Sequence, residues 1–315
     1  MAASVLTAIG LVADALTTVG FFEANVPGKA AEGATVRIKA GLPDLGNDGD
    51  SLSGSINKVY SFSQVNGYQG QADGCDIGSG GICDRTIDAG VGGQRAKYVS
   101  ISNNDDATCI AWITVTQFDG TFGGAWTGDI GSVCGQSWYE SVEVAGRLDD
   151  GGDYVPRCTW IDADHTNDIA AASLKFDTSA YGENVNDTAS SNAGCTYTIF
   201  GPDSGPIADQ PGAKRSVSER PQWMTEALVV SNIASHSAKG LCESATSWGL
   251  DFVDAHGNFC DMGSKTLTPL CSSQDVDGCV DVDEDESAVV KRMSVAKRTT
   301  SVKHKSYKKI AKWGF

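Results

Sequence analysis

The residues best suited to chemistry in this chain lie in one short acidic run, Asp162-Ala163-Asp164-His165, directly after an apolar segment that ends at Ile161. A loop at the end of a strand brings such side chains together. Two carboxylates and an imidazole can bind a metal ion or exchange protons with a substrate. The alternative is a turn in which the aspartates accept hydrogen bonds from nearby backbone N–H groups. Asp162, Asp164 and His165 are the candidate catalytic residues, and the two aspartates are candidate metal ligands.

A second acidic run begins at Asp275 and reads DVDGCVDVDEDE. Its aspartates 281, 283 and 285 are spaced like the ligands of a calcium loop. The sixth position of that pattern is Glu286 instead of glycine, and the twelfth is Arg292 instead of glutamate. Asp281, Asp283 and Asp285 are therefore candidate metal ligands, and a solvated acidic run is the alternative.

Other catalytic signatures are absent from the sequence. It has no G-x-S-x-G elbow, no HExxH, no phosphate-binding loop and no dinucleotide fingerprint. We therefore expect no cofactor, and a hydrolase centred on Asp162, Asp164 and His165 is the enzymatic alternative.

The ten cysteines predict disulfide bonds, because their number is even and no CxxC or CxxH spacing repeats. Cys75 and Cys83 enclose a short glycine-rich loop that a disulfide would close, whereas the last four cysteines allow three pairings. Disulfides indicate an oxidising compartment, and the glycosylation sequon at Asn186 agrees with secretion. The expected disulfide cysteines are Cys75, Cys83, Cys109, Cys134, Cys158, Cys195, Cys242, Cys260, Cys271 and Cys279.

The candidate loop belongs to a stretch of apolar runs separated by turn residues, which predicts strands. Around Trp112 both faces of one strand are apolar, as in the middle of a sandwich, and Cys158 and Trp160 share a face of another. Thr35–Lys39 reads as an edge-type strand. We therefore predict a mostly β protein with a sandwich-like antiparallel body over residues 30–205. The aromatic residues Trp126, Trp138 and Tyr139 belong either to its core or to an exposed sugar-stacking platform.

Residues 1–29 carry apolar residues at helical spacing from Val5 to Val19, which predicts an N-terminal amphipathic helix, with a signal peptide as the alternative. Residues 206–220 form a linker that contains the dibasic pair Lys214-Arg215. The segment 221–290 is predicted to be helical and stapled by disulfides, because Pro221 and an apolar stripe from Trp223 to Leu241 follow a helix start signal. Within it, residues 254–258 are predicted to form a hairpin turn.

The chain has 24 basic and 40 acidic residues, a net charge of −16 and a pI of about 4.5, which disfavours binding to nucleic acid. Nine basic residues and no acidic ones lie in the basic tail, 291–315. Two fates are open to this tail. It docks on the acidic body through Tyr307 and Trp313, or it is released by cleavage at dibasic pairs as a cationic peptide. The processing candidates are Lys214, Arg215, Lys291, Arg292, Lys297 and Arg298.

Two stretches, CIAWITV…GGAWTGDIGSVCGQSWY…PRCTWIDADHTNDI and SHSAKGLCESATSWGLDFVDAHGNFCDMGSKTLTPLCSS, resemble secreted, cysteine-rich proteins of filamentous ascomycete fungi that have no assigned function. The resemblance covers most of Thr35 to Cys279. It implies export, disulfides and a fungal source, and it carries over no catalytic residues.

These observations predict a secreted, extracellular protein that acts without catalysis in recognition, in the cell wall, or as a toxin or effector. Its expected partner is cell-wall carbohydrate or another extracellular protein, and no stretch is long enough to span a membrane. The alternatives are the hydrolase described above and a proprotein cleaved at its Lys-Arg sites.

Overall fold

The structure is a computed structural model that describes residues 26–28, 30, 32–43, 52–147, 152–191, 193–208, 220, 222–244, 246–295 and 298–315. The apolar repeat from Val5 to Val19, on which the N-terminal helix prediction rests, lies outside the described residues, as do Lys214, Arg215 and Lys297. The chain divides into two compact units, one of residues 1–43 and 49–216 and the other of residues 44–48 and 217–315. Among the described residues, 26–208 belong to the N-terminal unit and 220–315 to the C-terminal unit.

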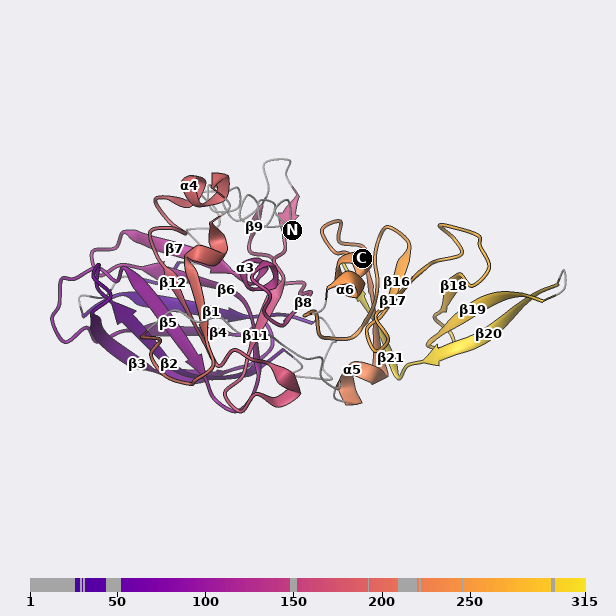
Figure 1. The fold of residues 1–315 in the computed structure, drawn as a ribbon, viewed down its shortest axis with the longest axis horizontal. Helices are drawn as coiled ribbons and strands as arrows, with labels where there is room; N and C mark the ends of the chain where they lie inside the picture. The colour runs from indigo at the N-terminus through magenta and orange to yellow at the C-terminus, as the bar shows by residue number, and fades with distance from the viewer. Residues whose placement is uncertain are drawn as a thin grey trace. The chain divides into compact units, whose positions relative to one another are not determined.

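The N-terminal unit is built from two antiparallel sheets (Figure 1). The first has the order β4 (Ile82–Thr86), β1 (Thr35–Ala40), β6 (Thr108–Thr116), β11 (Cys158–Ile161) and β8 (Trp138–Tyr139), and β7 (Phe122–Thr127) also pairs with β6. The second has the order β13 (Thr198–Gly201), β12 (Ser173–Asp177), β5 (Tyr98–Asn103), β2 (Gly54–Phe62) and β3 (Tyr68–Ile77). The described residues of the unit also form a two-stranded ribbon, β9 (Gly146–Arg147) and β10 (Asp153–Tyr154), and four short helices, α3 (Gly128–Val133), η2 (Thr166–Asp168), α4 (Val185–Ser190) and η3 (Gly194–Thr196).

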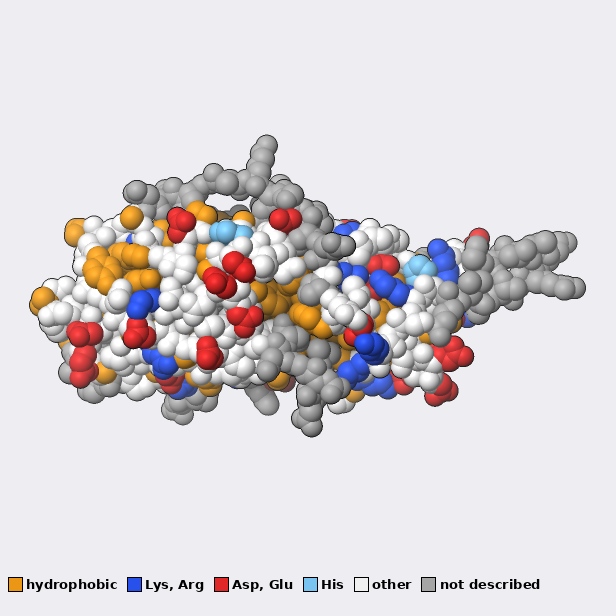
Figure 2. Space-filling view, turned by 90° about the horizontal axis from the view of Figure 1, so that it is seen from below, with side chains coloured by type: hydrophobic (Ala, Val, Ile, Leu, Met, Phe, Trp, Pro, Cys, Tyr) orange, Lys and Arg blue, Asp and Glu red, His pale blue; other side chains and the backbone are white. Residues whose placement is uncertain are grey.

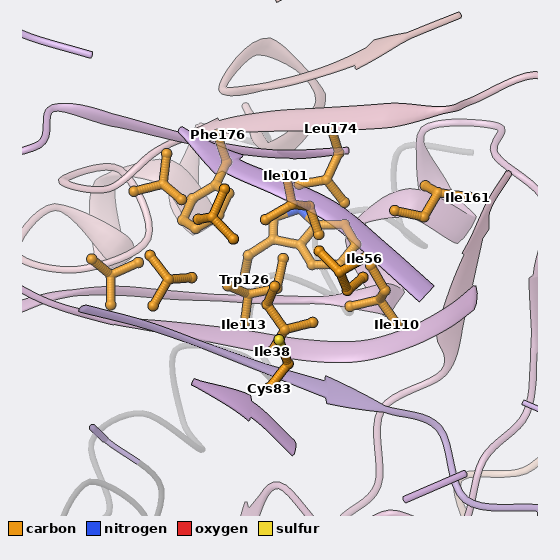
Figure 3. Close-up of a cluster of buried hydrophobic side chains, with 14 of the residues drawn as sticks. Ile38, Ile56, Cys83, Ile101, Ile110, Ile113, Trp126, Ile161, Leu174 and Phe176 are labelled. Atoms are coloured by element: carbon orange, nitrogen blue, oxygen red, sulfur yellow. The ribbon is translucent and has the colours of Figure 1, made fainter. Parts of the chain in front are cut away.

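The two sheets share one hydrophobic core, which confirms the mostly β, antiparallel body. Alternate residues of each strand point inward, so Ile38 and Ile113 from the first sheet meet Ile101 and Phe176 from the second (Figure 3). Trp126 lies among them with none of its surface exposed. All nine residues of β6 are buried, as expected for a strand with two apolar faces. The prediction of an edge strand at Thr35–Lys39 is wrong, because β1 lies between β4 and β6.

The C-terminal unit is also built mainly from strands. Its larger sheet has the order β17 (Thr266–Pro269), β16 (Asn258–Asp261), β15 (Asp251–Val253), β14 (Ala227–Ser231) and β21 (Lys309–Trp313). A second sheet contains β18 (Val280–Asp283), β19 (Ala288–Val295) and β20 (Arg298–Ser306). Two short helices are described, α5 (Gln222–Glu226) and α6 (Ala238–Glu243). The predicted hairpin turn is confirmed, since Val253 pairs with Phe259 across residues 254–258.

The prediction of a helical segment over 221–290 is wrong. Its helical stripe, from Trp223 to Leu241, is divided among α5, β14 and α6. β14 reads ALVVS and runs parallel to both β15 and β21. A central parallel strand is apolar on both faces, so its sequence resembles a continuous apolar run and can imitate one face of a helix.

The segment 291–315 is part of the fold instead of a free tail. It supplies the second half of β19, all of β20, and β21, which pairs with β14 along its whole length. Tyr307 and Trp313 are 6 % and 0 % exposed, so both aromatic rings are buried within the C-terminal unit. This burial agrees with docking of the segment on the acidic part of the chain.

All ten cysteines form disulfides, as predicted. The expected pair Cys75–Cys83 joins β3 of one sheet to β4 of the other. The remaining four pairs are Cys109–Cys158, Cys134–Cys195, Cys242–Cys260 and Cys271–Cys279. Three of the five disulfides therefore lie in the N-terminal unit and two in the C-terminal unit, and none joins one unit to the other.

Candidate functional site

The loop after β11 holds the candidate residues of the N-terminal unit. Asp162 directly follows the strand, and its backbone N–H donates to the carbonyl oxygen of Ala171 at 2.8 Å. The next N–H, of Ala163, donates to Asn104 at 3.1 Å. The first residue of the loop is thus fixed to neighbouring parts of the sandwich, and the residues after it turn outward.

Asp162 is fully buried, at 0 % exposure, whereas Asp164 and His165 are exposed. One oxygen of Asp162, Oδ2, accepts a hydrogen bond from the Thr166 hydroxyl at 2.6 Å. Its other oxygen, Oδ1, is buried and has no donor among the described residues. Burial raises the pKa of Asp162 to about 6, and the neighbouring Asp164 carboxyl adds to that rise.

Asp164 and His165 are used mainly to shape the loop. The Asp164 carboxylate accepts the backbone N–H of Thr166 at 3.1 Å, which is the predicted aspartate turn. The His165 ring points its Nδ1 at the carbonyl oxygen of Ile169, 2.9 Å away, so Nδ1 is the donor. His165 also adopts a left-handed backbone conformation with φ 57°. The structure thus brings the two aspartates together but directs the imidazole to the backbone.

No three His, Cys, Asp or Glu side chains among the described residues are grouped so that they could hold a metal ion. In the second acidic run, the three candidate aspartates lie in separate surroundings. Asp281 lies in β18 and pairs with Arg292 of β19, with an oxygen–nitrogen distance of 2.9 Å. Asp283 accepts the backbone N–H of Glu286 at 3.0 Å, and Asp285 is exposed in the following turn. These three aspartates shape a strand and turn and do not surround one point.

The aromatic platform considered from sequence is not on the surface. Trp126, Trp138 and Tyr139 are 0 %, 3 % and 0 % exposed, so these residues belong to the interior. The predicted pairing of a disulfide with a tryptophan is present, since Cys158 and Trp160 lie on one face of β11 and Cys158 bonds to Cys109. Asn186, in α4, is exposed.

A buried polar cluster that the sequence did not reveal lies beside α3. The Tyr154 hydroxyl donates to Asp129 at 2.6 Å, and Arg157 lies between Asp129 and Glu140, 3.9 and 3.6 Å away. The Arg157 guanidinium also stacks on Trp138 at 4.4 Å. Burial raises the pKa of Asp129, although Arg157 opposes that rise. Because Asp129 and Glu140 are 6 % and 1 % exposed, the cluster ties α3 to its neighbours instead of presenting acids to a substrate.

The C-terminal unit contains a serine–histidine pair that no sequence motif indicated. Ser231 Oγ lies 2.7 Å from His236 Nδ1. The His236 ring packs edge-on against Phe252 and Trp313, each with its centroid 5.7 Å away. Ser231 is 2 % and His236 1 % exposed, so a substrate cannot reach the hydroxyl, and the pair is part of the packing around β14.

Comparison with models of known protein families finds no match, and a search of curated proteins finds none either. In the part of the chain that is described, no helix is both long enough and apolar enough to cross a bilayer.

Proposed function

We propose that this is a secreted protein, of fungal origin, that works outside the cell by recognition and without catalysis. The observation that carries the proposal is the pairing of all ten cysteines in five disulfides. Disulfides persist in oxidising compartments and are rare where thiols are kept reduced. The resemblance of the sequence to exported fungal proteins supports the same location.

The partner that we favour is a cell-wall polysaccharide, and the surface near the start of β3 supports this choice. The Tyr68 ring is 54 % exposed, and the nearby Val65 and Val91 are 87 % and 63 % exposed. One amide side chain contacts the ring directly, because the Tyr68 hydroxyl donates to Gln71 at 3.1 Å, and a further amide pair lies next to it in sequence, where Gln69 donates to Gln94 at 3.1 Å. Figure 2 shows hydrophobic side chains gathered at the left end of the molecule, with acidic and basic side chains beside them. An exposed ring bordered by amides is suited to stacking on a sugar and bonding its hydroxyls.

A pull-down on insoluble cell-wall polysaccharides tests this function. We expect the intact protein to bind, Tyr68→Ala to weaken binding at least several-fold, and the protein to release no soluble sugar. Tyr197→Ala is the matched control, because Tyr197 is also an exposed ring, at 38 %, and directly precedes β13, at the opposite edge of the sheet from β3. Equal binding by Tyr68→Ala and the intact protein would remove this surface from the proposal, and binding to secreted proteins alone would point to a protein partner.

The hydrolase alternative has a separate test. If Asp162, Asp164 and His165 catalyse a reaction, Asp164→Asn and His165→Ala abolish an activity while the melting temperature stays nearly constant. The contact of His165 with the Ile169 carbonyl favours the structural role, for which both variants change stability only.

A second function is supported by the distribution of the disulfides. Because none of them joins the two units, a cut after Arg215 would yield two separate disulfide-bonded proteins. The pair Lys291-Arg292 is a poorer cleavage site for a dibasic-specific protease than Lys214-Arg215. Both of its residues pair with β18 or β20, and Arg292 also binds Asp275 and Asp281. Digestion with a protease specific for dibasic pairs, followed by non-reducing mass spectrometry, checks this. Separation of two fragments at residue 215 supports a proprotein, whereas resistance of the native chain refutes it.

A further inference from the structure

One oxygen of the buried Asp162 carboxylate lacks a hydrogen-bond partner among the described residues. The side chain is 0 % exposed, and only Oδ2 has a donor, the hydroxyl of Thr166. The buried Oδ1 has none among the described residues. A buried carboxylate oxygen is normally hydrogen-bonded or bound to a metal ion, because leaving it without a partner forfeits its hydration. The position of Oδ1 therefore indicates a missing partner.

The neighbouring Asp164 carboxyl increases the need of Asp162 for a positively charged partner. The negative charge of the Asp164 side chain adds to the rise in the pKa of Asp162, because a carboxylate repels a second carboxylate. No lysine, arginine or histidine of the described residues forms an ion pair with either of them. Repulsion between two neighbouring acids without a cation favours a shared proton or a bound positive ion.

The loop keeps this pair in place independently of any ligand. The two N–H groups of Asp162 and Ala163 are bonded to Ala171 and Asn104, and the Asn103 amide donates to the Ile161 carbonyl at 3.1 Å. Further along the loop, His165, Asn167 and Asp168 have φ of 57°, 58° and 54°, a left-handed conformation that few residues other than glycine adopt. A pair of acids held on the rim of a sheet by fixed backbone contacts is preorganised for binding.

We propose that Asp162 and Asp164 bind a calcium ion at the end of β11. Calcium prefers hard oxygen ligands and accepts irregular geometry, so two carboxylates can be completed by water and backbone carbonyl oxygens. The deeper oxygen, Asp162 Oδ1, then has its partner, and the exposed Asp164 reaches the ion from the solvent side. With only two carboxylates the site is weak, in the range of about 10⁻⁴–10⁻³ M that is usual for extracellular modules.

Calcium titration of the full-length protein, after dialysis against a chelator, tests the site by calorimetry and by the melting temperature. We expect one binding event and a melting temperature that rises with calcium concentration. Asp164→Asn should weaken binding at least tenfold, and it should still fold because Asp164 is exposed. The control is Glu183→Gln, which removes an exposed acid from the loop before α4 of the same unit and should leave binding unchanged.

Three outcomes would overturn the proposal. The first is the absence of calcium binding by the intact protein. The second is equal binding by Asp164→Asn and the intact protein. The third is an equal loss in Asp164→Asn and Glu183→Gln, which would mean that calcium only screens surface charge. A protein that ignores calcium but gains stability at low pH through Asp162 would show that a proton occupies the pair.

Discussion

Lys175 is a buried lysine whose protonation makes the stability of the fold depend on pH. It lies on β12 and is 2 % exposed, and its amine donates to Asn66 at 2.5 Å and to the Ile207 carbonyl at 3.0 Å. The amine also lies 3.5 Å from the centre of the Phe62 ring. No carboxylate of the described residues pairs with it. Burial lowers the pKa of Lys175 to about 8.

The pH dependence of stability follows from that shift. The unfolded lysine keeps its ordinary pKa of about 10.4, so between pH 8 and pH 10 the unfolded chain binds more protons than the folded one. The free energy of unfolding should therefore rise with pH in this window, by at most about 3 kcal/mol. Denaturant titrations at several pH values check this in the intact protein and in Lys175→Met, where the rise should become smaller but persist in part, because burial also lowers the pKa of Lys265 to about 8. In the control Lys58→Met, which removes a lysine paired with Asp73 at the surface, the rise should persist.

At this scale the sequence predicted the acidic loop but not its internal geometry. The run Asp162–His165 places its polar side chains after a strand, and that much can be read directly. Alternation along a strand cannot show that Asp162 turns inward, nor that His165 adopts φ 57° and bonds Ile169. Both depend on residues 103–104 and 169–171, which the fold brings beside the loop. The cluster of Asp129, Tyr154 and Arg157 was missed for the same reason, because its members come from separate elements.

At the scale of elements, the basic C-terminal strands are matched by acids of the same unit. Arg292 pairs with Asp275 and Asp281 at 2.8 and 2.9 Å, and Lys305 pairs with Asp251 and Asp261 at 2.6 and 3.1 Å. Lys308 and Lys312 pair with Glu226 and Glu284. The basic residues of 291–315, whose charge suggested docking, therefore form ion pairs with acidic residues of the C-terminal unit. The exposed pairs contribute little individually, so the buried rings must supply most of the stability.

Trp313 is the ring on which this packing depends. It is 0 % exposed in β21 and packs edge-on against Phe252 at 5.7 Å. Trp313→Ala should lower the free energy of unfolding of the C-terminal unit by about 3–5 kcal/mol, because truncating a buried tryptophan leaves a cavity. Phe315→Ala is the matched control, since Phe315 is 77 % exposed two residues later. Equal unfolding midpoints for both variants in denaturant would show that β21 does not stabilise the unit.

The type of secondary structure could be predicted where the local sequence pattern is compatible with only one type. The strand around Trp112, the turn at 254–258 and the closed loop from Cys75 to Cys83 depend on near neighbours, and all three are confirmed. β14 was wrongly predicted as helix, because its strand conformation depends on pairing with β21, whose first residue lies about 80 positions later. Its two parallel neighbours decide its conformation, and neither is visible in its own sequence.

For the whole molecule, the arrangement of disulfides implies that each unit is stabilised separately. Cys109–Cys158 closes a separation of 49 residues in the N-terminal unit, and Cys242–Cys260 closes 18 residues in the C-terminal unit. A disulfide stabilises mainly by restricting the unfolded chain, more so for a longer loop. Each bond therefore restricts the unfolded state of its own unit and not that of the other.

Removing one disulfide from each unit in turn tests this separation. The double variant Cys109→Ala/Cys158→Ala should lower the stability of the N-terminal unit by about 4 kcal/mol, and Cys242→Ala/Cys260→Ala that of the C-terminal unit by about 3 kcal/mol, as their loop lengths imply. Hydrogen exchange can follow the two effects separately, using amides of β6 and β14 as probes. Each variant should accelerate exchange in its own unit alone. Faster exchange in both units from either variant would mean that they unfold as one cooperative body, which would weaken the case for two separable products of cleavage at Arg215.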